Sequence, residues 1–214
     1  MSVFRNADGK PVLLNIVEAI QQNKAYLSEI DGLIGDGDHG MNMNKGFTLF
    51  KERFGNKDFS FSEGLSALGT ILFSEIGGSM GPIYGTILMD AADVGEDFDE
   101  ITIANLAQML EAGLQGLQDI VEAQVGDKTL VDTLSPAVDA LKNAAHEKLD
   151  YLTALKQMKD AARSGRDSTK DMVAKFGRSS RLGERSRGVL DAGSVSCCII
   201  LTAMADGIEK VLVD

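Results

Sequence analysis

The stretch DGLIGDGDHGMNMNKGF, residues 31 to 47, places Asp31, Asp36 and Asp38 within eight positions of one another. The glycines between them leave the backbone free to turn the three carboxylates toward one point. Like charges repel at such short range, so the arrangement requires a positive charge among them. Clustered carboxylate oxygens are the ligands of a hard divalent cation, above all Mg²⁺. The stretch therefore predicts a magnesium site.

Two familiar aspartate-rich motifs fit this stretch less well. An EF-hand needs a glutamate at its twelfth position, but counting from Asp31 or Asp36 reaches Asn42 or Phe47. A haloacid-dehalogenase phosphatase needs an apolar strand before its Asp-x-Asp pair, and a glycine-rich turn stands there instead. A solvated acidic turn with an Asx cap on the next helix stays open, although three carboxylates exceed what a cap needs.

Three further segments, GGSMGP, GDKT and GRSSRLGERSRG…DAG, carry residues that are unusual for plain connections. Backbone amides in GGSMGP, residues 77 to 82, suit a phosphate at a helix start, but a tight turn between two close helices accounts for this motif equally well. GRSSRLGERSRG, residues 177 to 188, is rich in arginine, and GDKT and DAG offer turns with a hydroxyl or a carboxylate. Together these segments supply metal ligands, an anion cradle and cations. That combination indicates a magnesium–nucleotide site for phosphoryl transfer.

Composition narrows the class of protein. The 214 residues are 44% apolar with a net charge of −11, which argues against nonspecific binding to nucleic acid or to an anionic membrane. The window from Arg163 to Arg187 nevertheless carries +5, a patch suited to a small anion. Adjacent Cys197 and Cys198 bridge only with strain, so we expect reduced, buried thiols. The start has no apolar stretch of signal-peptide length, and we expect a cytoplasmic protein.

Apolar residues recur at helical spacing almost throughout, and no segment has the pattern of a strand. We expect one all-α domain over residues 1–214, with about eight helices in an up-and-down bundle. The expected helices cover about 12–30, 41–54, 60–76, 82–92, 101–124, 130–147, 151–176 and 194–211, with Pro136 marking a kink or a start. Alternate loops of such a bundle share one end. The four unusual segments are alternate loops, so they should meet there.

GDGDHGMNMNKGF, GGSMGPIYGT, GDKTLVD and GRSSRLGERSRG…DAG also resemble the ADP-binding (DhaL-type) subunit of phosphotransferase-dependent dihydroxyacetone kinase, in the same order and across the whole chain. The resemblance implies a barrel of eight antiparallel helices with ADP and Mg²⁺ bound at one end. It also implies two partners. One subunit holds dihydroxyacetone on its own histidine, and a phosphotransferase-type donor subunit rephosphorylates the bound ADP in place. A chain of this length resembles that branch more than the fused, ATP-consuming kinases.

Roles carried over from the resemblance make Asp31, Asp36 and Asp38 the magnesium ligands. Arg178 is implied to face the phosphates and to be the catalytic residue, with Arg181 and Arg187 as flanking solvated charges. His146, midway along an expected helix, is interpreted as a surface residue. The residues implied to contact the nucleotide are His39, Gly40, Met41, Asn42, Ser79, Met80, Thr129, Arg178, Asp191, Ala192 and Gly193.

The chain departs from the family pattern at several positions. Met80 stands where a serine is common, Val121 and Glu122 replace a Gly-Lys pair, and Ala192 replaces a proline. These departures leave open looser nucleotide binding or a paralogue that acts on a related ketose. They also leave room for a nucleotide-loaded regulatory module that binds a transcription factor. The sequence does not determine the ketose, the phosphoryl donor or the oligomeric state, a homodimer included.

Overall fold

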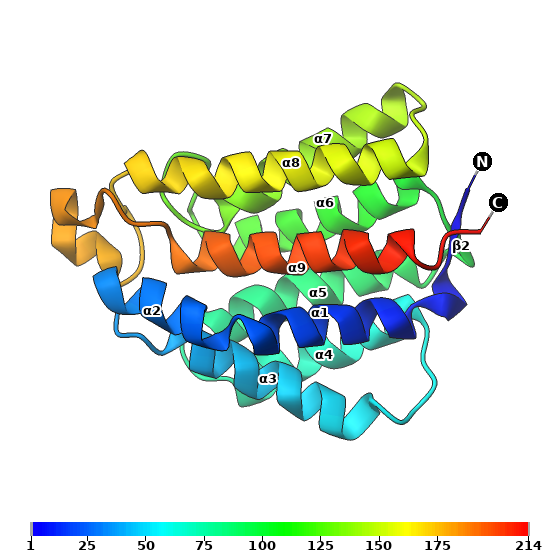
Figure 1. The fold of residues 1–214 in the computed structure, drawn as a ribbon, viewed down its shortest axis with the longest axis horizontal. Coiled ribbons are helices and arrows are strands. Elements are labelled where there is room, and N and C mark those ends of the chain that lie inside the picture. Colours follow the sequence, from blue (N-terminus) through cyan, green and yellow to red (C-terminus); the bar gives the residue numbers. More distant parts are fainter. Residues whose placement is uncertain (1, 214) are drawn as a thin grey trace.

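Helices form most of the chain, as the spacing of its apolar residues predicts. The computed structural model describes residues 2–213 (Figure 1). Within that range the α-helices are α1 (Lys10–Gln22), α2 (Lys24–Ile34), α3 (His39–Phe54), α4 (Phe61–Glu75), α5 (Met80–Gly95), α6 (Ile103–Ile120), α7 (Val131–His146), α8 (Tyr151–Ser168) and α9 (Ala192–Glu209). Three short 3₁₀ helices accompany them: η1 (Asn6–Asp8), η2 (Thr169–Asp171) and η3 (Ser179–Ser186). One short antiparallel pair, β1 (Phe4–Arg5) with β2 (Glu100–Ile101), was not expected from the sequence.

The expected first helix is in fact two helices. Asn23 separates α1 from α2 with φ −97° and ψ 6°, outside the helical region. Its side-chain Nδ2 donates to the carbonyl oxygen of Ala19 at 2.8 Å. Asparagine side chains commonly compete with the backbone in this way and interrupt helices. Because α2 continues from α1 toward the same end of the molecule, the two helices share one place in the bundle (Figure 1).

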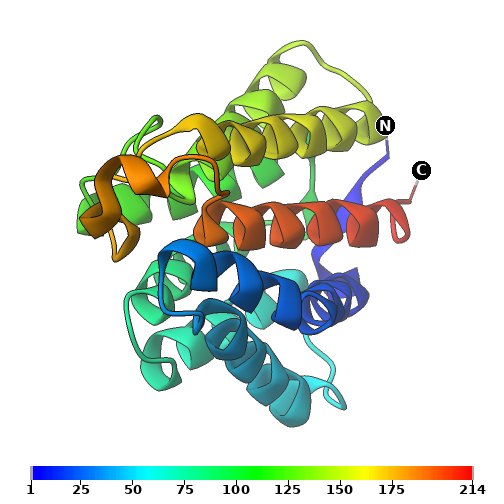
Figure 2. The same ribbon diagram turned by 60° about the vertical axis from the view of Figure 1, so that its left-hand side comes forward.

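The helices close into a ring. From α3 to α9, each helix packs against the next in the chain, and α1 packs against both α3 and α9. With α1 and α2 sharing one place, the ring has the eight places expected, and the all-α antiparallel fold is confirmed (Figures 1 and 2). The two termini lie at the end of the ring opposite to α2 and η3 (Figure 1).

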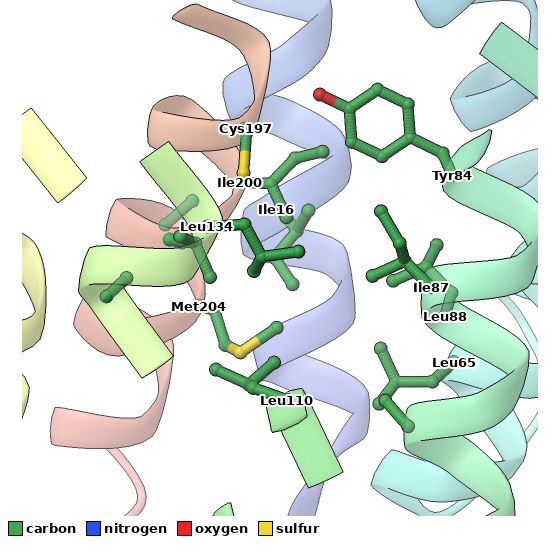
Figure 3. Close-up of a cluster of buried hydrophobic side chains, with 14 of the residues drawn as sticks. Ile16, Leu65, Tyr84, Ile87, Leu88, Leu110, Leu134, Cys197, Ile200 and Met204 are labelled. Atoms are coloured by element: carbon green, nitrogen blue, oxygen red, sulfur yellow. The ribbon is translucent and has the colours of Figure 1, made fainter. Parts of the chain in front are cut away.

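The core fills the interior of this ring. Figure 3 shows side chains from different helices that converge there, and they include Ile16, Leu65, Leu110, Leu134 and Met204. Helix α9 is long and apolar enough to cross a membrane by length and composition, but 72% of its 18-residue window is buried inside the fold. It is therefore a core helix here. It carries Cys197 and Cys198, both free and buried as expected.

Several helix boundaries differ from the expected ones. Helix α5 begins at Met80, two residues before Pro82, and Pro136 lies inside α7, so it does not mark the start of that helix. Helix α8 ends at Ser168 instead of extending to 176. The hydroxyls of Ser168 and Thr169 donate to the carbonyl oxygens of Gly165 and Arg166 at 2.6 and 2.7 Å. These side-chain bonds compete with continuation of the helix. The residues beyond are thereby free to form a loop.

Helices α7 and α8 pack closely together at Gly165. A Cβ there would lie 2.0 Å from the carbonyl oxygen of Asp132, which Pro136 leaves without its helical N–H donor. Gly165→Ala should therefore lower the free energy of unfolding by about 1–3 kcal/mol. Gly32→Ala is the matched control. Gly32 lies in α2, and a Cβ at this position would have its nearest neighbour, the Cα of Gly37, at 3.9 Å. The control should gain up to about 1 kcal/mol from helix propensity. Urea denaturation giving equal changes for both variants would contradict this packing.

Candidate functional site

The four unusual loops meet around one cavity, as the alternation of loops predicts. It lies at the end of the ring marked by α2 and η3, on the left of Figure 1 and turned forward in Figure 2. The lining comes from the connections α2–α3, α4–α5, α6–α7 and α8–α9. Its volume of about 390 Å³ is in the range of small-molecule sites. The cavity is therefore the candidate site.

Three carboxylates converge at one edge of this cavity. Asp31 lies in the last turn of α2, and Asp36 and Asp38 lie in the loop before α3. One carboxylate oxygen from each lies within 4.8 Å of the others. A Cβ at position 35 would lie 2.3 Å from Asp31 Oδ1, so glycine at that position leaves the Asp31 carboxylate its room. Oxygen donors at this spacing fit a hard divalent cation.

The interpretation of this stretch as an Asx cap is wrong. Asp38 does occupy the N-cap position of α3, but its side chain makes no capping hydrogen bond. The backbone N–H of His39 instead donates to Asp31 Oδ2 at 3.3 Å, which orients Asp31 from the helix start. The carboxylate of Asp38 therefore lies close to those of Asp31 and Asp36 and does not bond the backbone at the start of α3. This arrangement favours the metal site over a structural turn.

The only sequence-predicted catalytic residue lies directly beside the carboxylates. Residues 172–188, here called the arginine loop, connect η2 to the approach of α9 and include η3, which packs against α2. From this loop, the guanidinium of Arg178 forms an ion pair with Asp36. Both side chains are exposed, with relative accessibilities of 61% and 38%, so solvent weakens the pair. Arg178 can therefore exchange Asp36 for another anion at little cost.

The geometry of the glycine turn before α5 is compatible with both roles that the sequence left as alternatives. Gly77 and Gly78 line the cavity, and a Cβ at either would meet nothing within 4 Å. Gly78 has φ +77°, a conformation that favours glycine. The cavity therefore has open space beside the start of α5, and helix N–H groups at such a position can bind an anion. Gly81 allows the tight turn between α4 and α5, because a Cβ at this position would lie 2.3 Å from the carbonyl oxygen of Ile76.

A buried hydrogen-bond network joins three sides of the cavity. His39 Nε2 lies 2.8 Å from Ser196 Oγ, and Ser196 Oγ lies 2.6 Å from the hydroxyl of Tyr84. Tyr84 also donates to the carbonyl oxygen of Gly193 at 3.1 Å. Figure 3 shows Tyr84 at one end of the core cluster, near Cys197. The network thereby fixes the starts of α3, α5 and α9 relative to one another.

Burial shapes the charge of groups around this network. Burial lowers the pKa of His39 to about 4 against the opposing attraction of Asp31, so its imidazole is neutral at pH 7. Asp191 caps α9 by accepting from the N–H of Ser194 at 2.7 Å. Burial raises the pKa of Asp191 to about 6, because the ionised form is poorly solvated there. The DAG segment therefore serves first as a helix cap.

Most predicted site residues line the cavity. They are Asp31, Asp36, Asp38, His39, Asn42, Ser79, Met80, Thr129, Arg178, Asp191, Ala192 and Gly193. Gly40 and Met41 lie outside the lining: Gly40 is buried against α2, with its Cβ position 2.0 Å from the carbonyl oxygen of Lys24, and Met41 is exposed. His146 is exposed, as expected.

Several residues at the cavity were not predicted, because nothing in their type or local sequence indicates a function. Tyr84 and Ser196 sit inside apolar helical stretches, and Lys128 was only one residue of the GDKT turn. An apolar part of the lining, formed by Ile83, Leu117, Val121, Ala123 and Leu130, was also unforeseen. Val121 was noted as a departure, and the structure places it in this apolar part.

Exposed apolar side chains surround the cavity. Six of the eight large apolar side chains that are exposed within residues 2–213 lie near the helix ends and loops at this end of the ring: Leu33, Met41, Phe73, Ile120, Val125 and Phe176. Single exposed apolar residues are ordinary, but six of eight at one end of the ring is an uneven distribution.

Comparison with known proteins gives consistent matches. The DAK2 domain matches residues 33–206. The ADP-binding subunit of PEP-dependent dihydroxyacetone kinase 1 of Listeria innocua is 36% identical over 188 residues, covering 87% of this chain and 89% of that subunit. The corresponding Escherichia coli subunit is 37% identical over 183 residues, covering 84% and 86%. The solved dihydroxyacetone kinase of C. freundii matches the fold with TM-score 0.73 and 22% identity, covering 94% of this chain and 34% of that longer one.

The network beneath the cavity should contribute measurably to stability. Ser196→Ala leaves His39 Nε2 without its partner, and we expect a loss of about 1–3 kcal/mol in the free energy of unfolding. Ser74→Ala is a suitable control, because among the described residues that exposed hydroxyl bonds only the carbonyl oxygen of Thr70 in its own helix. The control should change stability by less than about 0.5 kcal/mol. Equal effects of the two substitutions in urea denaturation would show that the network is not stabilising.

Proposed function

Because this chain belongs to the DAK2 domain family, we propose that it is the ADP-binding subunit of a dihydroxyacetone kinase. In this proposal ADP stays bound as a carrier. It is rephosphorylated in place, and its terminal phosphoryl group then passes to dihydroxyacetone held by a partner subunit. The observation that carries the proposal is the juxtaposition of three carboxylates with Arg178 at the edge of a nucleotide-sized cavity. Similar proteins named as ADP-binding subunits support it.

Magnesium fits the donor set of this cavity. Asp31, Asp36 and Asp38 would hold it, since one oxygen of each lies within 4.8 Å of the others. An ionised carboxylate presents acceptor oxygens and no donor, as a hard cation requires. Bound magnesium supplies neutralisation of phosphate charge, which phosphoryl transfer requires. A solved relative in the same fold, the kinase from C. freundii, has been determined in complex with AMP-PNP and Mg²⁺. That precedent supports binding of a nucleotide together with magnesium in this fold.

The chain's own residues supply positioning and charge. The N–H groups at the start of α5, beside Gly77 and Gly78, would donate to phosphate oxygens. Arg178 offsets the negative charge that spreads over a transferring phosphoryl group. The apolar part of the lining, with Ile83 and Leu117, excludes water from one side of the ligand. A loose transition state asks for little more than this arrangement.

The exposed apolar residues around the cavity suit docking of the partner subunits. A bound phosphoryl group must meet its acceptor, so the partner must cover the end of the ring where the nucleotide lies. Leu33, Phe73 and Phe176 are among the apolar residues there that a partner would bury. Relatives named as PEP-dependent suggest that a phosphotransferase-type subunit is the donor. We further propose a single DAK2-type domain that acts in the cytoplasm, with the choice of ketose made by the partner.

The proposal is tested by reconstitution. The lone chain with ATP and free dihydroxyacetone should form product negligibly, because the residues of its cavity are occupied in holding nucleotide and metal. Adding a dihydroxyacetone-holding subunit should restore product, followed by phosphorus NMR. Rapid turnover by the lone chain would show a self-sufficient kinase instead. No product with any such subunit would remove the proposed function.

Arg178 should affect phosphoryl transfer more than binding. Arg178→Ala should keep ADP affinity within about tenfold, or about 1.4 kcal/mol. Single-turnover transfer should fall by about 10³-fold or more, as for other arginines that stabilise a transferring phosphoryl group. Arg181→Ala is the matched control, because Arg181 is exposed on the same loop. Equal, modest losses for the two variants would reduce the loop to a general source of positive charge.

Arg187, the other flanking arginine, is not a suitable control. Arg187 is not simply solvated as the sequence suggested, because its guanidinium donates to the carbonyl oxygen of Asp171 and to the carboxylate of Glu184. Its removal would disturb the arginine loop itself. A loss of transfer in Arg187→Ala would therefore not separate charge from loop geometry.

A further inference from the structure

Lys128 is a buried charged residue that the proposed chemistry does not use. It is 1% exposed, and its backbone has φ +62°, a conformation that costs energy for a residue with a Cβ. Burial lowers its pKa below the ordinary value for lysine. A buried ammonium group in strained backbone is retained only where its hydrogen bonds compensate. The partners of this ammonium group therefore indicate what it is for.

Both hydrogen bonds of Lys128 go to the base of the arginine loop. Its Nζ donates to the carbonyl oxygen of Thr169 and to that of Val189, each at 2.5 Å. Thr169 lies where the chain leaves α8 for the loop, and Val189 lies where it returns toward α9. The departing and returning segments are also joined to each other, because the N–H of Gly188 donates to the carbonyl oxygen of Lys170 at 2.7 Å. One ammonium group thus bridges the departing and returning segments.

Asp127 holds the same loop at a third point. Its carbonyl oxygen accepts from the N–H of Lys175 at 3.2 Å, and its carboxylate accepts from Lys175 Nζ at 2.5 Å. The hydrogen bond from Lys175 lowers the pKa of Asp127, so this carboxylate is ionised at neutral pH. Lys175 precedes Arg178 by three residues. The attachment is therefore close to the guanidinium that faces the cavity.

The turn that carries both residues is itself fixed to α7. Asp132, buried in the first turn of α7, accepts from the N–H groups of Gly126 and Thr129 at 2.6 and 2.7 Å. The hydroxyl of Thr129 accepts from the N–H of Val131 at 3.2 Å. These bonds hold the GDKT turn against a ring helix. A rigid turn that is attached to the segments flanking the arginine loop and to Lys175 within it restricts the loop as a whole.

We propose that Asp127 and Lys128 form a clamp that positions the arginine loop, and with it Arg178, over the carboxylate edge of the cavity. Lys128 is in this view a positioning residue that acts through Arg178. The inference rests on the proposed function for its catalytic consequence, but the clamp itself is a property of the chain alone. A direct contact of Lys128 with phosphate is the competing role, since Lys128 also lines the cavity.

The first experiment measures the loop without any activity. Hydrogen–deuterium exchange of residues 172–188 is compared between the wild-type chain, Lys128→Met and Lys148→Met. Lys148 is the matched control, an exposed lysine that also has a positive φ, +56°. Lys128→Met should speed exchange across the loop at least tenfold, and Lys148→Met should leave it unchanged. Unchanged exchange in Lys128→Met would overturn the clamp, whether or not the chain proves to be a kinase.

The second experiment separates positioning from direct contact. Magnesium–ADP affinity of Lys128→Met should stay within about threefold of the wild type, while single-turnover transfer falls at least tenfold. In a double-mutant cycle, Lys128→Met combined with Arg178→Ala should be no slower than Arg178→Ala alone, because the clamp acts through that residue. Additive losses of transfer, or a large loss of ADP affinity with loop exchange unchanged, would assign Lys128 to the phosphates and contradict the proposal.

A variant outside the core guards against failure of Lys128→Met to fold. Lys175 is 63% exposed, so Lys175→Met removes only its ion pair with Asp127 and leaves the buried residues in place. The clamp predicts faster exchange in this variant too, to a smaller extent, because the backbone bond to Asp127 remains. Exchange identical to that of the wild type in Lys175→Met would count against the clamp.

Discussion

Mutual repulsion of Asp31, Asp36 and Asp38 is the constraint on which this site depends. Charges about 4 Å apart cost about 1 kcal/mol per pair in water and about 4 kcal/mol near a protein surface. The fold nevertheless brings one oxygen of each carboxylate within 4.8 Å of the others. Gly35, which has no Cβ, leaves space for the Asp31 carboxylate. The ion pair with Arg178 offsets part of this repulsion. A divalent cation would offset more of it, and with such a cation the three carboxylates could bind phosphates.

The rest of the molecule holds the parts of this site in fixed places. A closed ring of packed helices keeps the four loops at one end, and the contacts of His39, Ser196 and Tyr84 fix three helix starts from below. The GDKT turn, fixed to α7, holds the arginine loop from the side. Phosphoryl transfer depends on orientation and charge more than on covalent chemistry. A rigid scaffold with one charged loop attached at defined points therefore suits the proposed function.

The sequence predicted the fold class and most of the cavity because the signals involved are local. Helical spacing of apolar residues indicated the helices, and the alternation of unusual loops placed them at one end. The break at Asn23 and the early end of α8 were missed, since both result from side chains that bond to nearby carbonyl oxygens. The roles of Lys128 and Ser196 arise from contacts 41 and 157 positions away along the chain, which no local pattern encodes. Gly40 and Met41 continue a motif in sequence, but the turn of α3 directs them away from the cavity.

The central claim, that the carboxylates act through a cation, is tested most directly by calorimetry of ADP binding. Binding is measured with magnesium and with EDTA, for the wild-type chain, for Asp36→Ala and for Asp58→Ala, an exposed carboxylate at a distant turn. We predict that EDTA weakens ADP binding to the wild type at least about 100-fold, or about 2.7 kcal/mol. Asp36→Ala should bind weakly in either condition, and Asp58→Ala should follow the wild type. Equal ADP affinity of the wild type with and without magnesium would contradict a role for the cation.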